Sequence, residues 1–197
     1  MRIGIYIYNE SEVLDFSGPF EVFSTANRLA EGVPPFDVFF ISEMGGRVVA
    51  RGGMTIVSDY SIDDHPPLDM LIVVGGDHRA ELSNKKVLDW IAESSSKVEL
   101  LVSVCTGVFI LAKAGVILDQ TVTTHWEDIE DLRKSFPQLD VVTSKRWVED
   151  GRLVSSGGIS AGIDMSLHLV ERIIGGGLAS RTARQMEYNW NGEYSTE

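Results

Sequence analysis

The chain has 197 residues, with 29 Asp and Glu against 17 Lys and Arg, so its formal net charge is −12. This acidic balance argues against a direct nucleic-acid partner and against docking on an anionic membrane, because both need clustered Lys and Arg. The single cysteine cannot form an intrachain disulfide, which excludes a stapled secreted scaffold. With 44% hydrophobic residues, the chain has enough apolar side chains for a sizeable core.

The N-terminus has no apolar segment typical of a signal peptide, and no apolar run approaches the ~18 residues that a membrane-spanning helix needs. No linker, repeat or low-complexity stretch interrupts the chain. We therefore expect a cytoplasmic protein that forms one domain over residues 1–197.

Short apolar strands alternate with helical patterns along the chain. In order, we expect a strand at 3–8, a helix at 18–28, a strand at 36–41, a hairpin at 48–57, a strand at 68–74, a helix at 84–93, a strand at 98–104, helices at 108–114 and 127–136, a strand at 141–142, a hairpin at 146–155, and helices at 161–174 and 178–190. Ser17 would cap the first helix, with Pro19 in its first turn. Apolar strands that alternate with helices predict an α/β fold with a mostly parallel, doubly wound sheet. The ligand crevice of such a sheet lies beyond the carboxyl ends of its strands.

Fingerprints for nucleotides and metals are missing from the sequence. There is no phosphate-binding G-x-x-x-x-G-K-[ST] or G-x-G-x-x-G motif, and the four histidines are dispersed without metal-ligand spacing. We therefore expect no metal and no cofactor. Asp164 and His168 lie four residues apart, and we expect them to form a solvated or partner-facing side of a helix.

The segment Gly158-Ile159-Ser160-Ala161-Gly162 fits the G-x-S-x-G pattern of a nucleophile elbow. A hydrolase triad would then need an acid and a histidine after Ser160, but the only candidates, Asp164 and His168, lie on the helix that Ser160 begins. A residue eight positions along that helix is about 12 Å from its start, so the triad cannot close. We expect instead a tight glycine turn that allows strand and helix to pack closely.

The segment Ser103-Val104-Cys105-Thr106-Gly107 is a stronger elbow, because an apolar strand leads into it and an apolar helix follows. Small residues flank the cysteine at positions −2 and +2. At a helix N-terminus, the dipole and free N–H groups favour a thiolate, and the N–H of Thr106 would face an oxyanion on the attacked carbon. From the residues alone, Cys105 is either a nucleophile or a buried structural cysteine.

Three other features follow expected strands. Gly75-Gly76 is either a turn or a second oxyanion donor. Asp15 is either a helix-terminus acid or a proton donor and acceptor beside the thiol. His125 is a base, a pocket wall or a structural histidine.

These residues resemble the ThiJ/PfpI superfamily, with its class I glutamine-amidotransferase-like fold, over about residues 2–190. Within it, the chain is most similar to the isonitrile hydratases and to the amidotransferase-like domains of AraC-type regulators. The motifs that carry the resemblance are residues 15–23 (DFSGPFEVF), 73–76 (VVGG), 103–107 (SVCTG), 123–126 (TTHW) and 156–164 (SGGISAGID).

The resemblance implies a flavodoxin-like three-layer sandwich and a homodimer. It implies Cys105 as nucleophile, with backbone N–H groups of Gly76 and Thr106 as oxyanion donors. In isonitrile hydratases, an aspartate that matches Asp15 acts beside the cysteine, and a threonine that matches Thr106 supports it.

Departures from the family's other branches narrow the expected activity. The peptidase-like branch has His directly after the cysteine, where this chain has Thr106, and the glyoxalase-like branch has Glu where this chain has Asp15. Amidotransferases need a later His-x-Glu pair, which we do not expect here.

We therefore expect a lyase that hydrates a small, neutral isonitrile to an N-substituted formamide, with His125, Trp126 and Ile159 at the substrate pocket. A closed apolar pocket with Asp15 beside the sulfur would favour this reaction, whereas an open, acid-free site would favour a sensor. The alternative is a ligand- or redox-sensing protein without catalysis. The sensor domains of AraC-type regulators precede a helix-turn-helix segment, which we do not expect in this chain.

Overall fold

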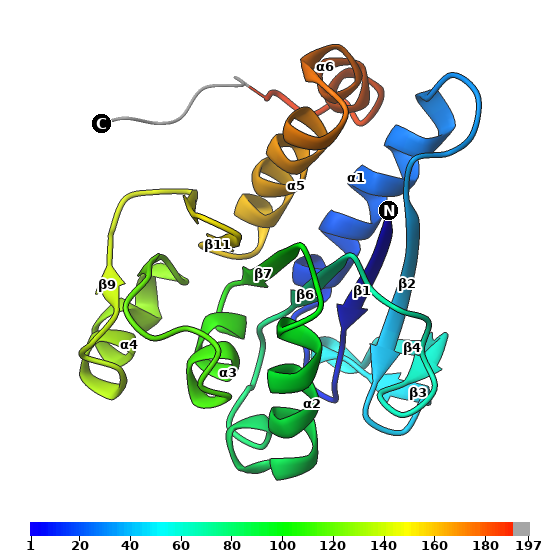
Figure 1. Ribbon diagram of the computed structural model, residues 1–197. Coiled ribbons are helices and arrows are strands. Elements are labelled where there is room, and N and C mark those ends of the chain that lie inside the picture. Colours follow the sequence, from blue (N-terminus) through cyan, green and yellow to red (C-terminus); the bar gives the residue numbers. More distant parts are fainter. Residues whose placement is uncertain (191–197) are drawn as a thin grey trace.

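The computed structural model describes residues 1–190, and a seven-stranded sheet forms the centre of this part of the chain (Figure 1). Its strand order is β10-β11-β7-β6-β1-β2-β5. The strands are β1 (Arg2–Tyr6), β2 (Asp37–Ser42), β5 (Tyr60–Ser61), β6 (Met70–Val73), β7 (Leu100–Val104), β10 (Trp147–Asp150) and β11 (Leu153–Ser156). All neighbouring pairs are parallel except the antiparallel hairpin β10–β11. The predicted mostly parallel sheet is therefore confirmed.

Helices cover both faces of the sheet and complete three layers, as expected for a flavodoxin-like sandwich (Figure 1). On one face, α1 (Val13–Leu29), α5 (Ser160–Ile173) and α6 (Gly176–Gln185) pack against one another. On the other face lie α2 (Lys85–Ser95), α3 (Gly107–Lys113) and α4 (Ile129–Ser135). Two small sheets complete the described elements: the antiparallel pair β3 (Gly46–Val49) and β4 (Thr55–Ser58), and the parallel pair β8 (Thr121–Val122) and β9 (Asp140–Val141).

The central strands explain why the apolar runs of the sequence are continuous. Every residue of β6 and β7 is buried. A parallel strand between two helical layers has no solvent-facing side, so neither face of the strand favours polar residues. The carboxyl ends of these two strands carry Gly75-Gly76 and Cys105, which places both segments at one edge of the sheet.

Helix α1 begins at Val13, five residues before the predicted start, so the prediction of Ser17 as N-cap is wrong. Ser17 lies inside the helix, where its hydroxyl donates to the carbonyl of Val13 at 2.8 Å, and Pro19 is also interior. The packing of α1 against α5 and α6 outweighs the usual preference for proline in a first turn. As a consequence, Asp15 is held by the first turn of a helix rather than by a loop.

The prediction of a solvated or partner-facing side at Asp164 and His168 is also wrong. His168 is buried, stacks on Trp147 with ring centroids 3.8 Å apart, and lies 2.7 Å from a carboxylate oxygen of Glu149. Asp164 pairs with Arg146. The β10–β11 hairpin thus covers this side of α5, a long-range contact that helical spacing alone cannot reveal.

The other differences concern the ends of elements. A 3-10 turn, Trp126–Asp128, precedes α4 where one continuous helix is predicted. Helix α6 ends at Gln185, five residues before its predicted end. The two-residue strands β5 and β8 are not predicted, because two residues carry no periodicity.

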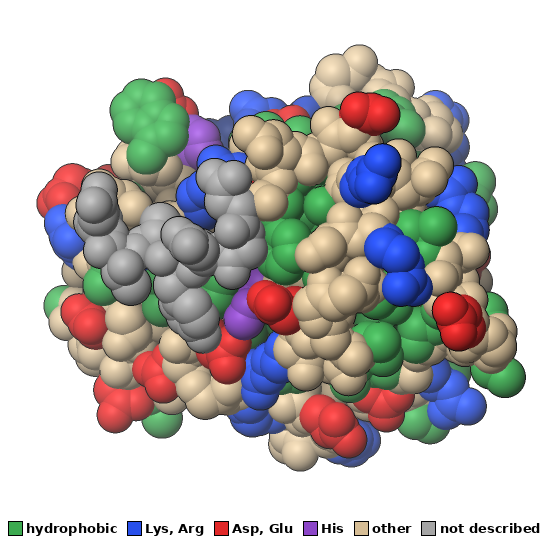
Figure 2. All heavy atoms as spheres, turned by 90° about the horizontal axis from the view of Figure 1, so that it is seen from above, with side chains coloured by type: hydrophobic (Ala, Val, Ile, Leu, Met, Phe, Trp, Pro, Cys, Tyr) green, Lys and Arg blue, Asp and Glu red, His purple; other side chains and the backbone are tan. Residues whose placement is uncertain are grey.

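Within residues 1–190, no helix is long and apolar enough to cross a membrane. Figure 2 shows the molecule from above, the side on which α5 and α6 lie in Figure 1. On this face, basic and acidic side chains are interspersed, with hydrophobic side chains between them.

Candidate active site

Cys105 lies in the sharp turn between β7 and α3, as the sequence predicts, and only 7% of it is exposed. Its φ is 54°, a left-handed conformation that non-glycine residues rarely adopt. Two hydrogen bonds hold the residue there: its N–H donates to the carbonyl of Ser156 at 3.0 Å, and its carbonyl accepts from the hydroxyl of Thr124 at 2.9 Å. Strained backbone that is fixed on both sides is characteristic of functional sites.

Two glycines are required for this turn. A Cβ on Gly107 would lie 2.1 Å from the carbonyl oxygen of Val73, which confirms that position +2 of the elbow accepts no side chain. A Cβ on Gly158 would lie 2.3 Å from Cβ of Cys105, and Gly158 has φ 79°. The predicted glycine turn at Gly158 is therefore confirmed, and its close neighbour is the cysteine itself.

Asp15 is fully buried, and helix α1 brings it next to Cys105. One carboxylate oxygen, Oδ1, accepts a hydrogen bond from the N–H of Ile159 at 2.7 Å. The other, Oδ2, has no hydrogen-bond partner within residues 1–190. Burial raises the pKa of Asp15 to about 7, against the lowering effect of the Ile159 N–H, with the charge of Glu12 adding to the increase.

The thiol of Cys105 differs from the sequence expectation. Burial raises its pKa well above the usual value, and the charge of Asp15 raises it further, whereas the N–H of Thr106 lowers it. The helix N-terminus therefore does not compensate for the loss of water and for the nearby carboxylate. The two shifts favour ionisation of the carboxyl before the thiol, which opposes the effect that the helix N-terminus has by itself.

Ile159 has φ 51° and ψ −122°, a conformation that glycine normally occupies. It is the second residue of a turn closed by the hydrogen bond from the N–H of Ala161 to the carbonyl of Gly158, at 2.9 Å. This orientation directs the Ile159 N–H at Asp15. The strained residue therefore positions the carboxylate beside the sulfur.

Thr106 and Gly76 form a compact pair. The N–H of Gly76 donates to the hydroxyl oxygen of Thr106 at 3.1 Å, and that hydroxyl donates to the carbonyl of Gly76 at 3.1 Å. The predicted oxyanion donor Gly76 thus has its N–H occupied within the protein. The N–H of Thr106, which acts on the sulfur of Cys105, is the donor nearer to the chemistry.

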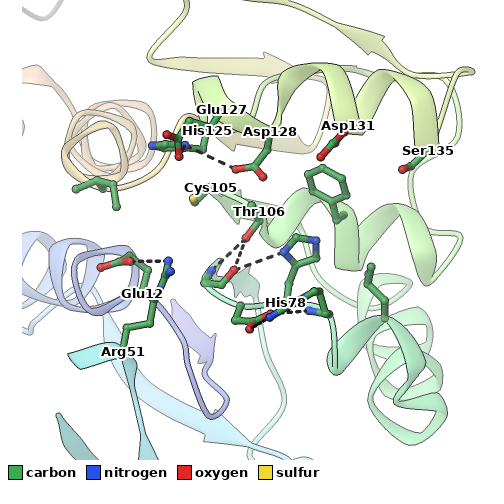
Figure 3. A pocket seen from close by; sticks show the side chains of 16 residues that line it. Glu12, Arg51, His78, Cys105, Thr106, His125, Glu127, Asp128, Asp131 and Ser135 are labelled. Carbon is green, nitrogen blue, oxygen red and sulfur yellow. Dashed lines mark hydrogen bonds and ion pairs between the residues drawn. The ribbon is translucent and has the colours of Figure 1, made fainter. Parts of the chain in front are cut away.

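A pocket of about 580 Å³ opens above the sulfur (Figure 3). Of the predicted residues, it is lined by Gly76, Cys105, Thr106, His125 and Ile159. It is an open pocket with charged residues in its wall, rather than the closed apolar pocket that would favour catalysis.

Trp126 lies elsewhere. It is 76% exposed and lines a second pocket, of about 680 Å³, that shares His125 and Ile159 with the first. These two residues form the partition between the pockets.

The segment His125-Trp126-Glu127 has His-x-Glu spacing, so the expectation that no such pair occurs is wrong. The structure places Nδ1 of His125 3.8 Å from a carboxylate oxygen of Glu127 and 3.6 Å from one of Asp128. Both acids line the pocket with the cysteine. The run of acidic residues after Trp126 was the available signal in the sequence.

The other residues that sequence reasoning missed reach the pocket from distant segments. Glu12 pairs with Arg51, which comes from the turn between β3 and β4, and His78 packs on Phe109 with ring centroids 4.7 Å apart. No local pattern marks these contacts. Within residues 1–190, no group of His, Cys, Asp and Glu could hold a metal ion.

Comparisons with known proteins identify the family of this chain. An isonitrile hydratase from Pseudomonas putida is 30% identical over 190 residues, which are 95% of this chain and 78% of that protein. The HTH-type transcriptional regulator CdhR from Pseudomonas aeruginosa is 31% identical over 88% of this chain, which spans only 51% of the regulator. The crystal structure of a THiJ/PfpI family protein from Pseudomonas syringae has the same fold, with a TM-score of 0.85 and 24% identity over 98% of this chain and 77% of that one. Residues 1–172, which contain every motif of the predicted resemblance, match the model of the DJ-1/PfpI family, and the chain therefore belongs to that family.

Proposed function

We propose that this protein hydrates isonitriles to N-substituted formamides, with Cys105 as nucleophile and Asp15 as the group that accepts and donates protons. The observation that carries the proposal is the pair itself: a buried carboxyl with a pKa of about 7 lies beside the only thiol, and that thiol lines a pocket that admits a ligand. A carboxyl that titrates near neutrality both takes and returns a proton efficiently. The 30% identity to an isonitrile hydratase supports this reaction among those the pair could perform.

In the first step, the sulfur of Cys105 forms a bond to the terminal carbon of R–N≡C. Because the resting sulfur is a thiol, its proton passes to the carboxylate of Asp15, whose Oδ2 has no other partner in the described chain. The same proton then moves to the attacked carbon, which gives the thioimidate R–N=CH–S–Cys. The N–H of Thr106 stabilises negative charge on the sulfur during the transfer.

In the second step, Asp15, again a carboxylate, takes a proton from water as the water oxygen attacks the thioimidate carbon. Asp15 passes this proton to the nitrogen, and the carbon becomes tetrahedral with sulfur and hydroxyl attached. The C–S bond then breaks, the carboxylate of Asp15 takes the hydroxyl proton, and Asp15 passes that proton to the sulfur. The products are R–NH–CHO and the original thiol, so one water is added in each cycle.

Incubation with an alkyl or aryl isocyanide, followed by NMR detection of the formamide, tests the proposal. We expect turnover by the wild type, none by Cys105→Ala, and a loss of at least about 100-fold in Asp15→Asn, the usual contribution of an acid–base group. Asp164→Asn is a matched control, since Asp164 pairs with Arg146 outside this pocket. Absence of formamide from the wild type at high enzyme concentration would overturn the proposal.

A second candidate is ligand sensing without turnover, and the openness of the pocket favours it, although the site is not free of acids. The regulator relatives, of whose length this chain spans about half, support the same function. Oxidant sensing is less favoured, because a raised thiol pKa leaves little thiolate to react with peroxide. Mass spectrometry after mild peroxide treatment separates the two, since selective conversion of Cys105 to sulfinate would favour an oxidant sensor.

From the family resemblance we also infer a homodimer, which light scattering on the purified protein tests.

A further inference from the structure

The pocket above Cys105 has an uneven charge. Five carboxylates line it, against two guanidinium groups. The carboxylates are those of Glu12, Asp77, Glu127, Asp128 and Asp131, and the guanidinium groups are those of Arg51 and Arg79.

Both guanidinium groups are already neutralised. Arg51 pairs with Glu12 at 3.3 Å, and Arg79 pairs with its near neighbour Asp77. This leaves one wall, formed by Glu127, Asp128 and Asp131, which has no Lys or Arg within ion-pair distance in residues 1–190. We call these three residues the acidic wall. Figure 3 shows its members on the opposite side of the cysteine from the Glu12–Arg51 pair.

Asp128 brings this charge closest to the chemistry. Its side chain is partly buried, and burial raises its pKa, while the imidazoles of His125 and His78 lower it. Its charge also contributes to the raised pKa of the Cys105 thiol, so its field reaches the sulfur. A carboxylate in a partly desolvated pocket acts more strongly on a ligand than one in bulk water.

The floor of the pocket shows independently that this is a place for a ligand. It holds a strained cysteine, and beside that cysteine lies the fully buried Asp15, one of whose oxygens has no partner in residues 1–190. A ligand that reacts at the sulfur therefore lies in the same pocket as the acidic wall.

We propose that the pocket selects ligands that carry an organic cation, with the reactive end at Cys105 and the positive group at the acidic wall. This deepens the proposed function by naming its substrate class: an isonitrile whose substituent bears an ammonium group. It differs from the neutral substrate expected from the sequence, because the fold decides that Glu127, Asp128 and Asp131 line the pocket of the cysteine.

Because Cys105 is the only cysteine, thiol-specific reagents report the field at the sulfur without any enzymatic activity. Methanethiosulfonates transfer their alkylthio group to a thiolate and release methanesulfinate. The probes are the 2-(trimethylammonio)ethyl and 2-sulfonatoethyl reagents, whose end groups are similar in size and opposite in charge. Each rate is divided by the rate of the same reagent with 2-mercaptoethanol. We expect the cationic reagent to react at least about tenfold faster than the anionic one.

Asp128→Asn and Asp131→Asn should each lower this ratio about threefold or more. Glu130→Gln is the matched control, because it removes one charge from the same helix but its side chain is 81% exposed, pairs with Arg133 and lines only the second pocket. The ratio in Glu130→Gln should stay near the wild-type value. A wild-type ratio near one, or a faster anionic reagent, would overturn the inference.

Two further measurements keep the test decisive. In the wild type, raising the salt concentration from about 0.01 M to about 1 M should reduce the ratio strongly, because it shortens the Debye length from about 30 Å to about 3 Å. In turnover, 2-(trimethylammonio)ethyl isocyanide should have a higher kcat/KM than its neutral isostere 3,3-dimethylbutyl isocyanide. If no isonitrile is hydrated but the reagent ratio is high, the proposed reaction fails and the cation preference stands. If both isonitriles are hydrated equally and the ratio is near one, only the cation preference fails.

Discussion

Replacing Asp15 with Asn should stabilise the folded protein above neutral pH while it abolishes proton transfer at the site. In the folded chain the pKa of Asp15 is about 7, against an ordinary value of 3.8. Between these two values the unfolded chain has lost the proton that the folded chain retains, so the stability of the wild type falls as the pH rises. The difference between the pKa values corresponds to about 4 kcal/mol, which is fully lost above about pH 7. Asn should retain the hydrogen bond from Ile159 and cannot ionise.

Urea unfolding at pH 5 and pH 8 measures this effect as a difference between variant and wild type. The advantage of Asp15→Asn should be about 2.5 kcal/mol larger at pH 8 than at pH 5, because the folded carboxyl is protonated at the lower pH. Glu130→Gln makes the same change in net charge at an exposed position and should show little pH dependence. If the advantage of Asp15→Asn is the same at both pH values, Asp15 ionises normally and the acid–base role proposed for it loses its physical basis.

Three other variants or reactions test the geometry of the site. Gly158→Ala should lower the free energy of unfolding by about 3 kcal/mol and slow the alkylation of Cys105, because the added Cβ would collide with Cβ of that cysteine. The control Gly151→Ala, at a glycine with φ 63° in open space, should lower the free energy of unfolding by only about 1 kcal/mol. Thr106→Val should lower the free energy of unfolding by about 1–3 kcal/mol, because the N–H of Gly76 loses its acceptor. Thr106→Ser keeps the hydroxyl and should be about as stable as the wild type. Equal stabilities of the two variants would contradict the role of the hydroxyl. The rate of alkylation of Cys105 by iodoacetamide should continue to rise above about pH 8.5, and a plateau below that pH would show that the thiol pKa is not raised.

The position of the cysteine could be predicted from the sequence because the elbow is a local feature. An apolar strand, a cysteine, a small residue two positions on and an apolar helix follow one another directly in the chain, and the structure has each of them where expected. The protonation state of Cys105 could not be predicted in this way. It depends on burial by other segments and on Asp15, which is 90 residues away in sequence, and these outweigh the local effect of the helix terminus.

The acidic wall is a second feature whose residues are evident in the sequence but whose role depends on the fold. Glu127, Asp128 and Asp131 lie close together in the sequence, but a solvated helix surface would have the same composition, so the sequence does not distinguish the two. Only the folded chain shows that these residues line the pocket of the cysteine while Arg51 and Arg79 are paired with other acids. The net charge of the chain therefore does not predict the acidic wall.

By itself, the sequence determined the class of fold, the order of most elements and the corner at which the thiol lies. These follow from periodicity, glycine positions and neighbouring residues, which act over a few positions. The tertiary structure alone decided that α1 begins early enough to hold Asp15 in a helix, that Ile159 is strained so that its N–H meets that carboxylate, and that burial raises the pKa of the Cys105 thiol. The physical reason is that pKa values and pocket walls depend on burial and on charges brought together from distant parts of the chain, and neither is a local property of the sequence.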